Sequence, residues 1–186
     1  MSSLHGLRDN LPRPIDDGAC DYLTGMMLPA VVLSSTGGHD VNLAALGPGR
    51  TILYYYPRTG VPGESLPQGW DAIPGARGST PQACAFRDHA ADLARLGAQV
   101  FELSTQDTPY QHEMAEHLHL PFEVLSDVQC TFADALRLPT FTVDGMRLIK
   151  RLTLIARENR IERGFYPVFP PSSIASDVVA WLENHA

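Results

Sequence analysis

The chain is short of cysteine, of long apolar runs and of surplus positive charge. Its 186 residues include only three cysteines, at positions 20, 84 and 130. An odd and sparse cysteine count argues against a framework of structural disulfides and favours a reducing compartment. No apolar run reaches the ~18–20 residues that a membrane-spanning helix needs. We therefore expect no membrane partner, and no cysteine spacing indicates a zinc site or any other metal.

The charge balance excludes a further class of partner. Fourteen basic residues stand against 21 acidic ones, giving a formal net charge of -7. Such a chain offers no reason to expect binding to nucleic acid or to an anionic membrane. Residues 1–18 contain charged residues and lack the apolar core of a signal peptide. We interpret residues 1–24 as the N-terminal extension of a cytoplasmic protein, and we expect no cofactor.

The sequence has enough apolar residues for one compact domain over residues 1–186. The hydrophobic content is 44%, which fits a single domain with a substantial core. Apolar and β-branched runs predict a hairpin over 29–43, a buried central strand over 51–56, strands over 100–104 and 122–127, and a hairpin over 152–165. Residues 58–75 are rich in glycine and proline and predict a long insertion loop.

Helices are predicted between and after these strands. The expected ranges are 80–94, 109–118, 130–136 and a last helix from Ser172 or Ser173 to about Asn184. Strands that alternate with helices and end in a hairpin and a helix indicate an α/β fold with a central mixed β-sheet flanked by helices.

Residues 77–88, which read RGSTPQACAFRD, are the most informative segment. They resemble the active-site segment of the bacterioferritin-comigratory (Q-type) peroxiredoxins, which are thiol peroxidases. The phrases LYYYP at 53–57, LPF at 120–122 and LSD at 125–127 are also similar to that family. This resemblance covers roughly residues 25–185 and implies a thioredoxin-like peroxiredoxin fold.

The resemblance assigns roles to three residues. It places the peroxidatic cysteine at position 79, which here is Ser79, and makes Cys84 the resolving cysteine. Arg151, which opens the run RLTLI, corresponds to the family arginine that lies beside the nucleophile and lowers its pKa. Because cysteine is often replaced by serine to trap a reduced-like form, we expect an engineered variant. A natural relative with serine is the alternative.

The family reaction depends on a thiolate. A helix N-terminus and a nearby cation favour that anion, so a cysteine placed there can attack peroxide. A serine hydroxyl stays protonated and has no comparable oxidation chemistry. We therefore expect the parent activity to be reduction of a peroxide substrate, recycled by thioredoxin or a similar dithiol protein, and the Ser79 form to be inactive. We expect a monomer or a weak homodimer.

Two threonines are further candidates for the substrate site. Thr80 precedes a proline and is expected to cap the active-site helix, although Ser79 could also be a simple cap. The family usually carries a threonine three residues before the nucleophile, where this chain has Ala76. Thr59, at the start of the insertion loop, is the candidate to replace its hydroxyl, with Trp70 or Ile73 as a wall of the pocket.

Other interpretations of these residues stay open on the sequence alone. Cys84 could be a buried structural cysteine, and Arg151 a solvated arginine at a strand edge. The whole chain could be a non-peroxidase redox sensor or binding protein that uses Cys84. A thiol transferase using Cys84 alone is also conceivable, but the absence of a Cys-x-x-Cys pair argues against it.

Overall fold

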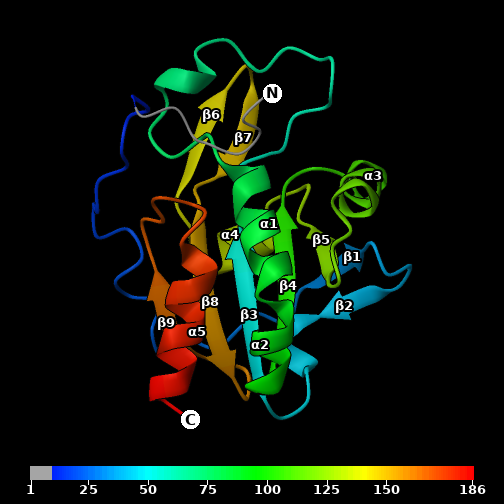
Figure 1. Ribbon diagram of the computed structural model, residues 1–186, viewed down its shortest axis with the longest axis vertical. Helices are drawn as coiled ribbons and strands as arrows, with labels where there is room; N and C mark the ends of the chain where they lie inside the picture. The colour runs from blue at the N-terminus through cyan, green and yellow to red at the C-terminus, as the bar shows by residue number, and fades with distance from the viewer. Residues whose placement is uncertain (1–9) are drawn as a thin grey trace.

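The computed structural model describes residues 10–186, which are organised around a seven-stranded mixed β-sheet. The strands lie in the order β2-β1-β5-β4-β3-β8-β9 (Figure 1). Their bounds are β1 Val32–Ser35, β2 Asp40–Asn42, β3 Arg50–Tyr55, β4 Ala98–Ser104, β5 Glu123–Ser126, β8 Leu152–Arg157 and β9 Arg160–Phe165. Strands β3, β4 and β5 are parallel, whereas the other pairings are antiparallel. The predicted α/β fold with a central mixed sheet is confirmed.

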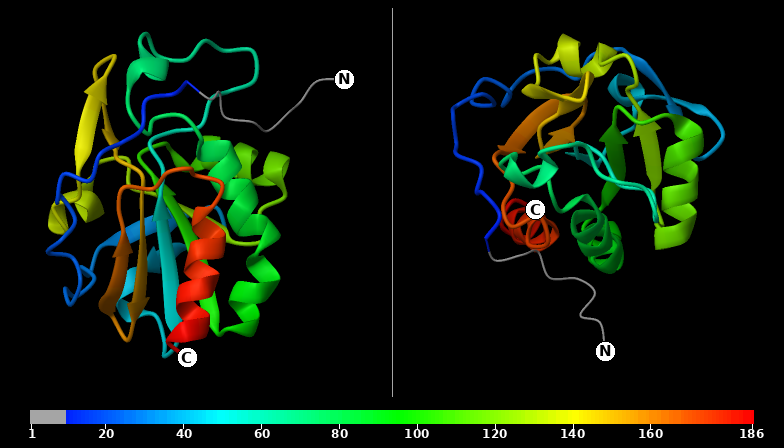
Figure 2. Two further views of the ribbon diagram at one scale, coloured as in Figure 1. Left: turned by 60° about the vertical axis from the view of Figure 1, so that its left-hand side comes forward. Right: turned by 90° about the horizontal axis from the view of Figure 1, so that it is seen from above.

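Helices cover both faces of this sheet. Their bounds are α1 Ser79–Asp88, α2 Ala90–Arg95, α3 Thr108–Leu118, α4 Thr131–Ala135 and α5 Ile174–Asn184. Helices α1, α2, α3 and α5 lie on one face, and α4 lies on the other (Figure 2). Strand β3 is therefore covered on both faces, which explains its unbroken run of apolar and aromatic residues.

Alternate residues of β3 separate the two apolar cores. Tyr54 packs on the α1 side, where its ring stacks on Phe86 with ring centroids 4.1 Å apart. Tyr55 packs on the α4 side, where its ring lies 6.4 Å from that of Phe132. The side chains of a strand point alternately to opposite faces. Side chains of β3 and its neighbouring strands that point to the same face as Tyr54 therefore lie beneath α1.

Two local predictions differ from the structure. The helix expected over 80–94 is divided at His89, whose ring nitrogen lies 2.8 Å from the Ala85 carbonyl oxygen. A side chain that shares this carbonyl weakens the continuing helical ladder. The insertion loop contains a short 3-10 turn, Trp70–Ala72.

In addition to the two predicted hairpins, the structure has a third that was not predicted from the sequence. Strands β6 Thr140–Val143 and β7 Met146–Ile149 pair antiparallel as a separate two-stranded sheet. Asp144 and Gly145 connect them with φ values of 47° and 73°. An Asp-Gly pair between two short apolar runs is a strong hairpin signal. The sequence therefore contained a local signal for this hairpin.

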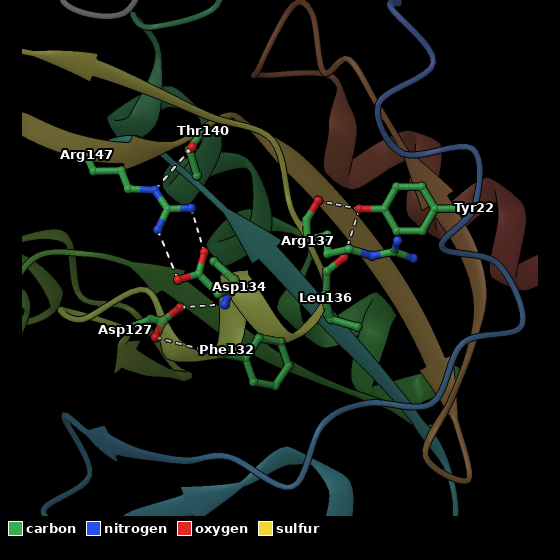
Figure 3. Close-up of polar contacts among 9 residues, drawn as sticks. Tyr22, Asp127, Phe132, Asp134, Leu136, Arg137, Thr140 and Arg147 are labelled. Atoms are coloured by element: carbon green, nitrogen blue, oxygen red, sulfur yellow. Dashed lines mark hydrogen bonds and ion pairs between the residues drawn. The ribbon is translucent and has the colours of Figure 1, made fainter.

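Polar contacts anchor α4 and its surroundings, as Figure 3 shows. The Asp127 carboxylate accepts hydrogen bonds from the backbone N–H groups of Phe132 (3.1 Å) and Ala133 (2.9 Å) at the start of α4. Arg147 of β7 forms an ion pair with Asp134 of α4. These contacts connect the β6–β7 hairpin to α4, and α4 to the segment that follows β5.

The described part of the N-terminal extension packs against the domain. Leu23 is fully buried, and the Tyr22 hydroxyl donates a 2.8 Å hydrogen bond to the Leu136 carbonyl (Figure 3). Residues 1–9 of the extension lie outside the described part of the chain. Among residues 10–186, no helix has the length and apolar character to span a bilayer.

Candidate active site

The N-terminus of α1 is formed by a glycine followed directly by the candidate nucleophile position. Gly78 occupies the N-cap position with φ 111°, a conformation that side-chain-bearing residues rarely adopt. Ser79 is therefore the first helical residue, and it is only 4% exposed. Its hydroxyl lies where the unpaired N–H groups of the first turn favour negative charge.

Thr80 does not cap the helix as expected. Its side chain is exposed, and no side chain at the N-cap position bonds to the α1 backbone. The reason is that the glycine turn starts the helix one residue earlier. Thr80 therefore lies inside the first turn, and the capping prediction is wrong. Its proposed part in substrate binding stays a prediction.

Arg151 lies against Ser79, as the resemblance implied. Its Nη2 donates a 3.2 Å hydrogen bond to the Ser79 hydroxyl oxygen. The same nitrogen lies 3.2–3.4 Å from the carbonyl oxygens of residues 75, 76 and 77. Arg151 is 4% exposed, so it is not a solvated arginine at a strand edge. Its charge is directed at position 79 from inside the protein.

Burial makes this cation unusual. It lowers the pKa of Arg151 to about 9, and the nearby Glu102 raises that pKa in part. The group still carries its proton at neutral pH. Every hydrogen-bond acceptor that it contacts in the described residues is neutral. An anion at position 79 would be the first charged partner to reach it.

Gln82 is a site residue that the sequence analysis did not single out. It lies three residues after Ser79 on α1, is completely buried, and accepts a hydrogen bond from Arg151 Nη1. Residues three apart on a helix lie on the same face. Two features of the sequence could have identified Gln82: its spacing from position 79 and its polar side chain within an alanine-rich helix.

Cys84 is free and 9% exposed, within the same helix as Ser79. Five helical residues advance about 7.5 Å along the axis and turn about 140° around it. Two side chains so placed cannot form a disulfide, which needs Cα atoms about 4.4–6.8 Å apart. A link between positions 79 and 84 would therefore require the first turns of α1 to unwind.

The structure gives Thr59 a different set of partners. Its hydroxyl and backbone N–H both donate to the Gln106 side-chain oxygen, at 3.2 and 2.9 Å. Its carbonyl accepts from the Tyr110 hydroxyl at 2.7 Å. Thr59 is buried, and its hydroxyl is engaged beside α3. A role for Thr59 in binding substrate stays a prediction.

Arg151 also lines a cavity of about 400 Å³. Ile73 lines it, as do residues of the described N-terminal segment. The full lining is Arg13, Pro14, Ile15, Asp17, Pro57, Ile73, Pro74, Gly75, Phe141, Lys150, Arg151, Tyr166, Pro167 and Val168. Trp70 instead packs in a small core with Ala76, Val143 and Leu148. Of the two expected walls, Ile73 is the one that lines the cavity.

Comparison with known proteins identifies the family of the chain. The redoxin family model matches residues 23–180. Peroxiredoxin Bcp of Escherichia coli is 29% identical over 168 residues, which cover 87% of this chain and 96% of that protein.

Solved structures share the fold. Peroxidoxin BcpB of Mycobacterium tuberculosis superposes with a TM-score of 0.72 at 24% identity, covering 88% of this chain and 97% of that one. The bacterioferritin comigratory protein of Xanthomonas campestris gives 0.69 at 20% identity, covering 87% and 98%. The chain therefore belongs to the redoxin family, and its relatives include bacterioferritin-comigratory (Q-type) peroxiredoxins.

Proposed function

We propose that the chain has the active site of a thiol-dependent peroxidase in which position 79 is the peroxidatic position. The observation that carries this proposal is the hydrogen bond from Arg151 to the Ser79 hydroxyl at the N-terminus of α1. A thiol at that position would lie beside a buried cation and a helix N-terminus. Both stabilise a thiolate relative to a thiol.

The proposed reaction has two chemical steps. The thiolate sulfur attacks one peroxide oxygen, the O–O bond breaks, and the other oxygen leaves as water or an alcohol after gaining a proton. The resulting sulfenic acid reacts with the Cys84 thiol, a disulfide forms and water leaves. Thioredoxin or a similar dithiol protein reduces the disulfide, and the cytoplasm is the compartment that suits this cycle.

Ser79 cannot start this cycle. Its hydroxyl keeps its proton, and it has no sulfenic acid state. The protein with Ser79 is therefore the inactive form of the site, whether the serine was introduced or is natural. The relatives support the reaction class: E. coli Bcp is named a peroxiredoxin, and the X. campestris structure concerns alkyl peroxide reduction.

The test is to measure peroxide consumption by the chain and by Ser79→Cys in a thioredoxin-coupled assay. We expect turnover only with Ser79→Cys, for hydrogen peroxide or for an organic hydroperoxide. Ser79→Ala serves as a matched control and should behave like the unaltered chain. Equal turnover by the unaltered chain and Ser79→Cys would remove position 79 from the mechanism.

A second function is favoured by the serine itself together with the free Cys84. A natural serine at position 79 would leave a redox sensor or a binding protein in which Cys84 is the reactive thiol. This alternative predicts that Ser79→Cys gains no peroxidase activity. It also predicts that Cys84→Ser abolishes a response of the unaltered chain to oxidant.

A further inference from the structure

Glu102 is a buried carboxyl group directly beneath the active-site helix. It lies in β4, is 0% exposed, and pairs in register with Tyr54 of β3. Tyr54 in turn pairs with Thr153 of β8, so the three residues occupy matching positions on neighbouring strands. Strands β4, β3 and β8 lie side by side in the sheet (Figure 1). Paired residues point to the same face of a sheet. The stacking of Tyr54 on Phe86 shows that this face is the one covered by α1.

Arg151 lies on the same face of the sheet, beneath α1. It comes two residues before Thr153, and its guanidinium contacts Ser79 and Gln82 on the first turn of α1. Residues two apart in an extended chain point to the same face, so Arg151 lies on the Glu102 face of the sheet. The effect of each group on the pKa of the other agrees with this placement: Arg151 lowers that of Glu102, and Glu102 raises that of Arg151. No ion pair joins them in the described residues.

Neither group has the partners that a charged pair needs. Both Glu102 carboxyl oxygens, the Arg151 Nε and the Tyr54 hydroxyl are buried without a hydrogen bond of normal geometry among residues 10–186. The Tyr54 hydroxyl is a nearby donor that lowers the pKa of Glu102. An ionised carboxylate without donors is costly to bury, and such a group usually takes up a proton instead. The geometry therefore favours a protonated Glu102 next to a charged Arg151.

The surrounding titratable groups agree with this assignment. Burial raises the pKa of Glu102 to about 8, and only part of this rise is offset by the Tyr54 hydroxyl and by Arg151. The charge of Glu102 acts on Tyr54 of β3 and on Tyr56, which follows the end of β3, and burial raises the pKa of each well above its ordinary value. Cys84 of α1 also contributes to raising the pKa of Tyr54. Near neutral pH, Arg151 is thus charged, whereas Glu102 and the two tyrosines around it are neutral.

We propose that Glu102 is a positioning residue whose proton controls how much of the Arg151 charge is available to an anion at position 79. When Glu102 keeps its proton, Arg151 is free to stabilise that anion. When Glu102 loses its proton, its carboxylate becomes the counter-ion of Arg151. This inference rests on the proposed function only in taking position 79 as the place of the anion.

The coupling must act in both directions. If a carboxylate at 102 opposes an anion at 79, then an anion at 79 makes Glu102 hold its proton more tightly by the same factor. A carboxyl group with a merely structural role would titrate in the same way whatever residue occupies position 79. The identity of residue 79 is therefore the variable to change.

The test follows the Glu102 carboxyl by NMR in protein labelled with carbon-13 at the glutamate side chains. The signal is assigned by its loss in Glu102→Gln. We expect it to titrate near pH 8 in the unaltered chain and in Ser79→Ala. Ser79→Cys, once ionised, and Ser79→Asp should each raise the midpoint by about one pH unit, a tenfold tighter hold on the proton.

A second measurement uses the thiol of Ser79→Cys. The alkylation rate of the unaltered chain is subtracted as the background. The remaining rate at pH 6–7 should be the same in Ser79→Cys and in the Ser79→Cys, Glu102→Gln double variant, because glutamine resembles the protonated acid. Glu113→Gln, an exposed change on α3, is the matched control. A tenfold faster reaction in the double variant would mean that Glu102 is ionised and would overturn the proposal.

Two other results would also overturn it: a carboxylate signal for Glu102 already at pH 6, or the same midpoint with Ala, Cys and Asp at position 79. Ser79→Asp keeps the test informative if the introduced thiol stays protonated. None of these measurements needs peroxidase activity. A failure of the proposed function, seen as no peroxide consumption by Ser79→Cys, is therefore distinguishable from a failure of this coupling.

Discussion

The Ser79 hydroxyl accepts a 3.2 Å hydrogen bond from the guanidinium of Arg151, although the two residues are 72 positions apart in the sequence. This contact joins the first turn of α1 to the segment that enters β8. Both residues are 4% exposed. The contact therefore places a fixed positive charge and a helix N-terminus at one buried oxygen atom.

Removing the charge of Arg151 should weaken the site in the Ser79→Cys background. Arg151→Met should raise the thiol pKa and slow the reaction with peroxide, since a shift of one unit corresponds to ~1.4 kcal/mol of lost thiolate stabilisation. Arg151→Lys should restore only part of the rate, because lysine keeps the charge but lacks the planar set of donors. Thiol titration and stopped-flow kinetics measure both effects. An unchanged titration in Arg151→Met would exclude this role.

A substitution at Gln82 tests the electrostatic effect of Arg151 on position 79 rather than the stability of the fold. Gln82→Glu in the Ser79→Cys background places a carboxylate against Arg151, so we expect a thiol pKa higher by about one unit and a rate lower by about tenfold at neutral pH. Gln99→Glu makes the same chemical change at an exposed position of β4 and should have no such effect. Similar results for the two variants would show that Gln82 does not act through Arg151.

Oxidation of Ser79→Cys with one equivalent of peroxide should link positions 79 and 84 within one chain. The link requires local unwinding of α1, so it should be accompanied by loss of protection in amide hydrogen exchange over residues 79–88. Peptide mass mapping identifies the bond. Cys20 should remain reduced, because burial raises the pKa of its thiol to about 12. A bond from position 79 to Cys20 or Cys130 would instead make Cys84 structural.

The stability of the unaltered chain should fall as pH rises from about 5 to 8. Glu102 has a folded pKa of about 8 against an ordinary value of 4.5. The folded state therefore holds a proton that the unfolded state has released, and each pH unit in this window costs up to ~1.4 kcal/mol. Glu102→Gln should flatten the dependence, measured by denaturant unfolding at several pH values. Glu113→Gln should leave it unchanged.

Much of the fold could be predicted from local sequence. The unbroken run at 51–56 predicted a strand covered on both faces, and β3 is such a strand. Residues 109–118 predicted a helix, and α3 is found at Thr108–Leu118. These elements follow from side-chain pattern and backbone preference, which act over a few residues. The β6–β7 hairpin had a local signal too, in Asp144 and Gly145, but the sequence analysis did not use it.

The sequence by itself determined the active-site segment, the serine at position 79 and the chemistry that this serine cannot perform. It also indicated Arg151, through resemblance to a family. Only the tertiary structure brought Gln82 and Glu102 into the site, because their proximity to Arg151 depends on how α1 packs across β3, β4 and β8. Charge states depend on burial and on neighbours distant in sequence, so no local pattern could show that a glutamate in β4 lies beneath the helix and keeps its proton.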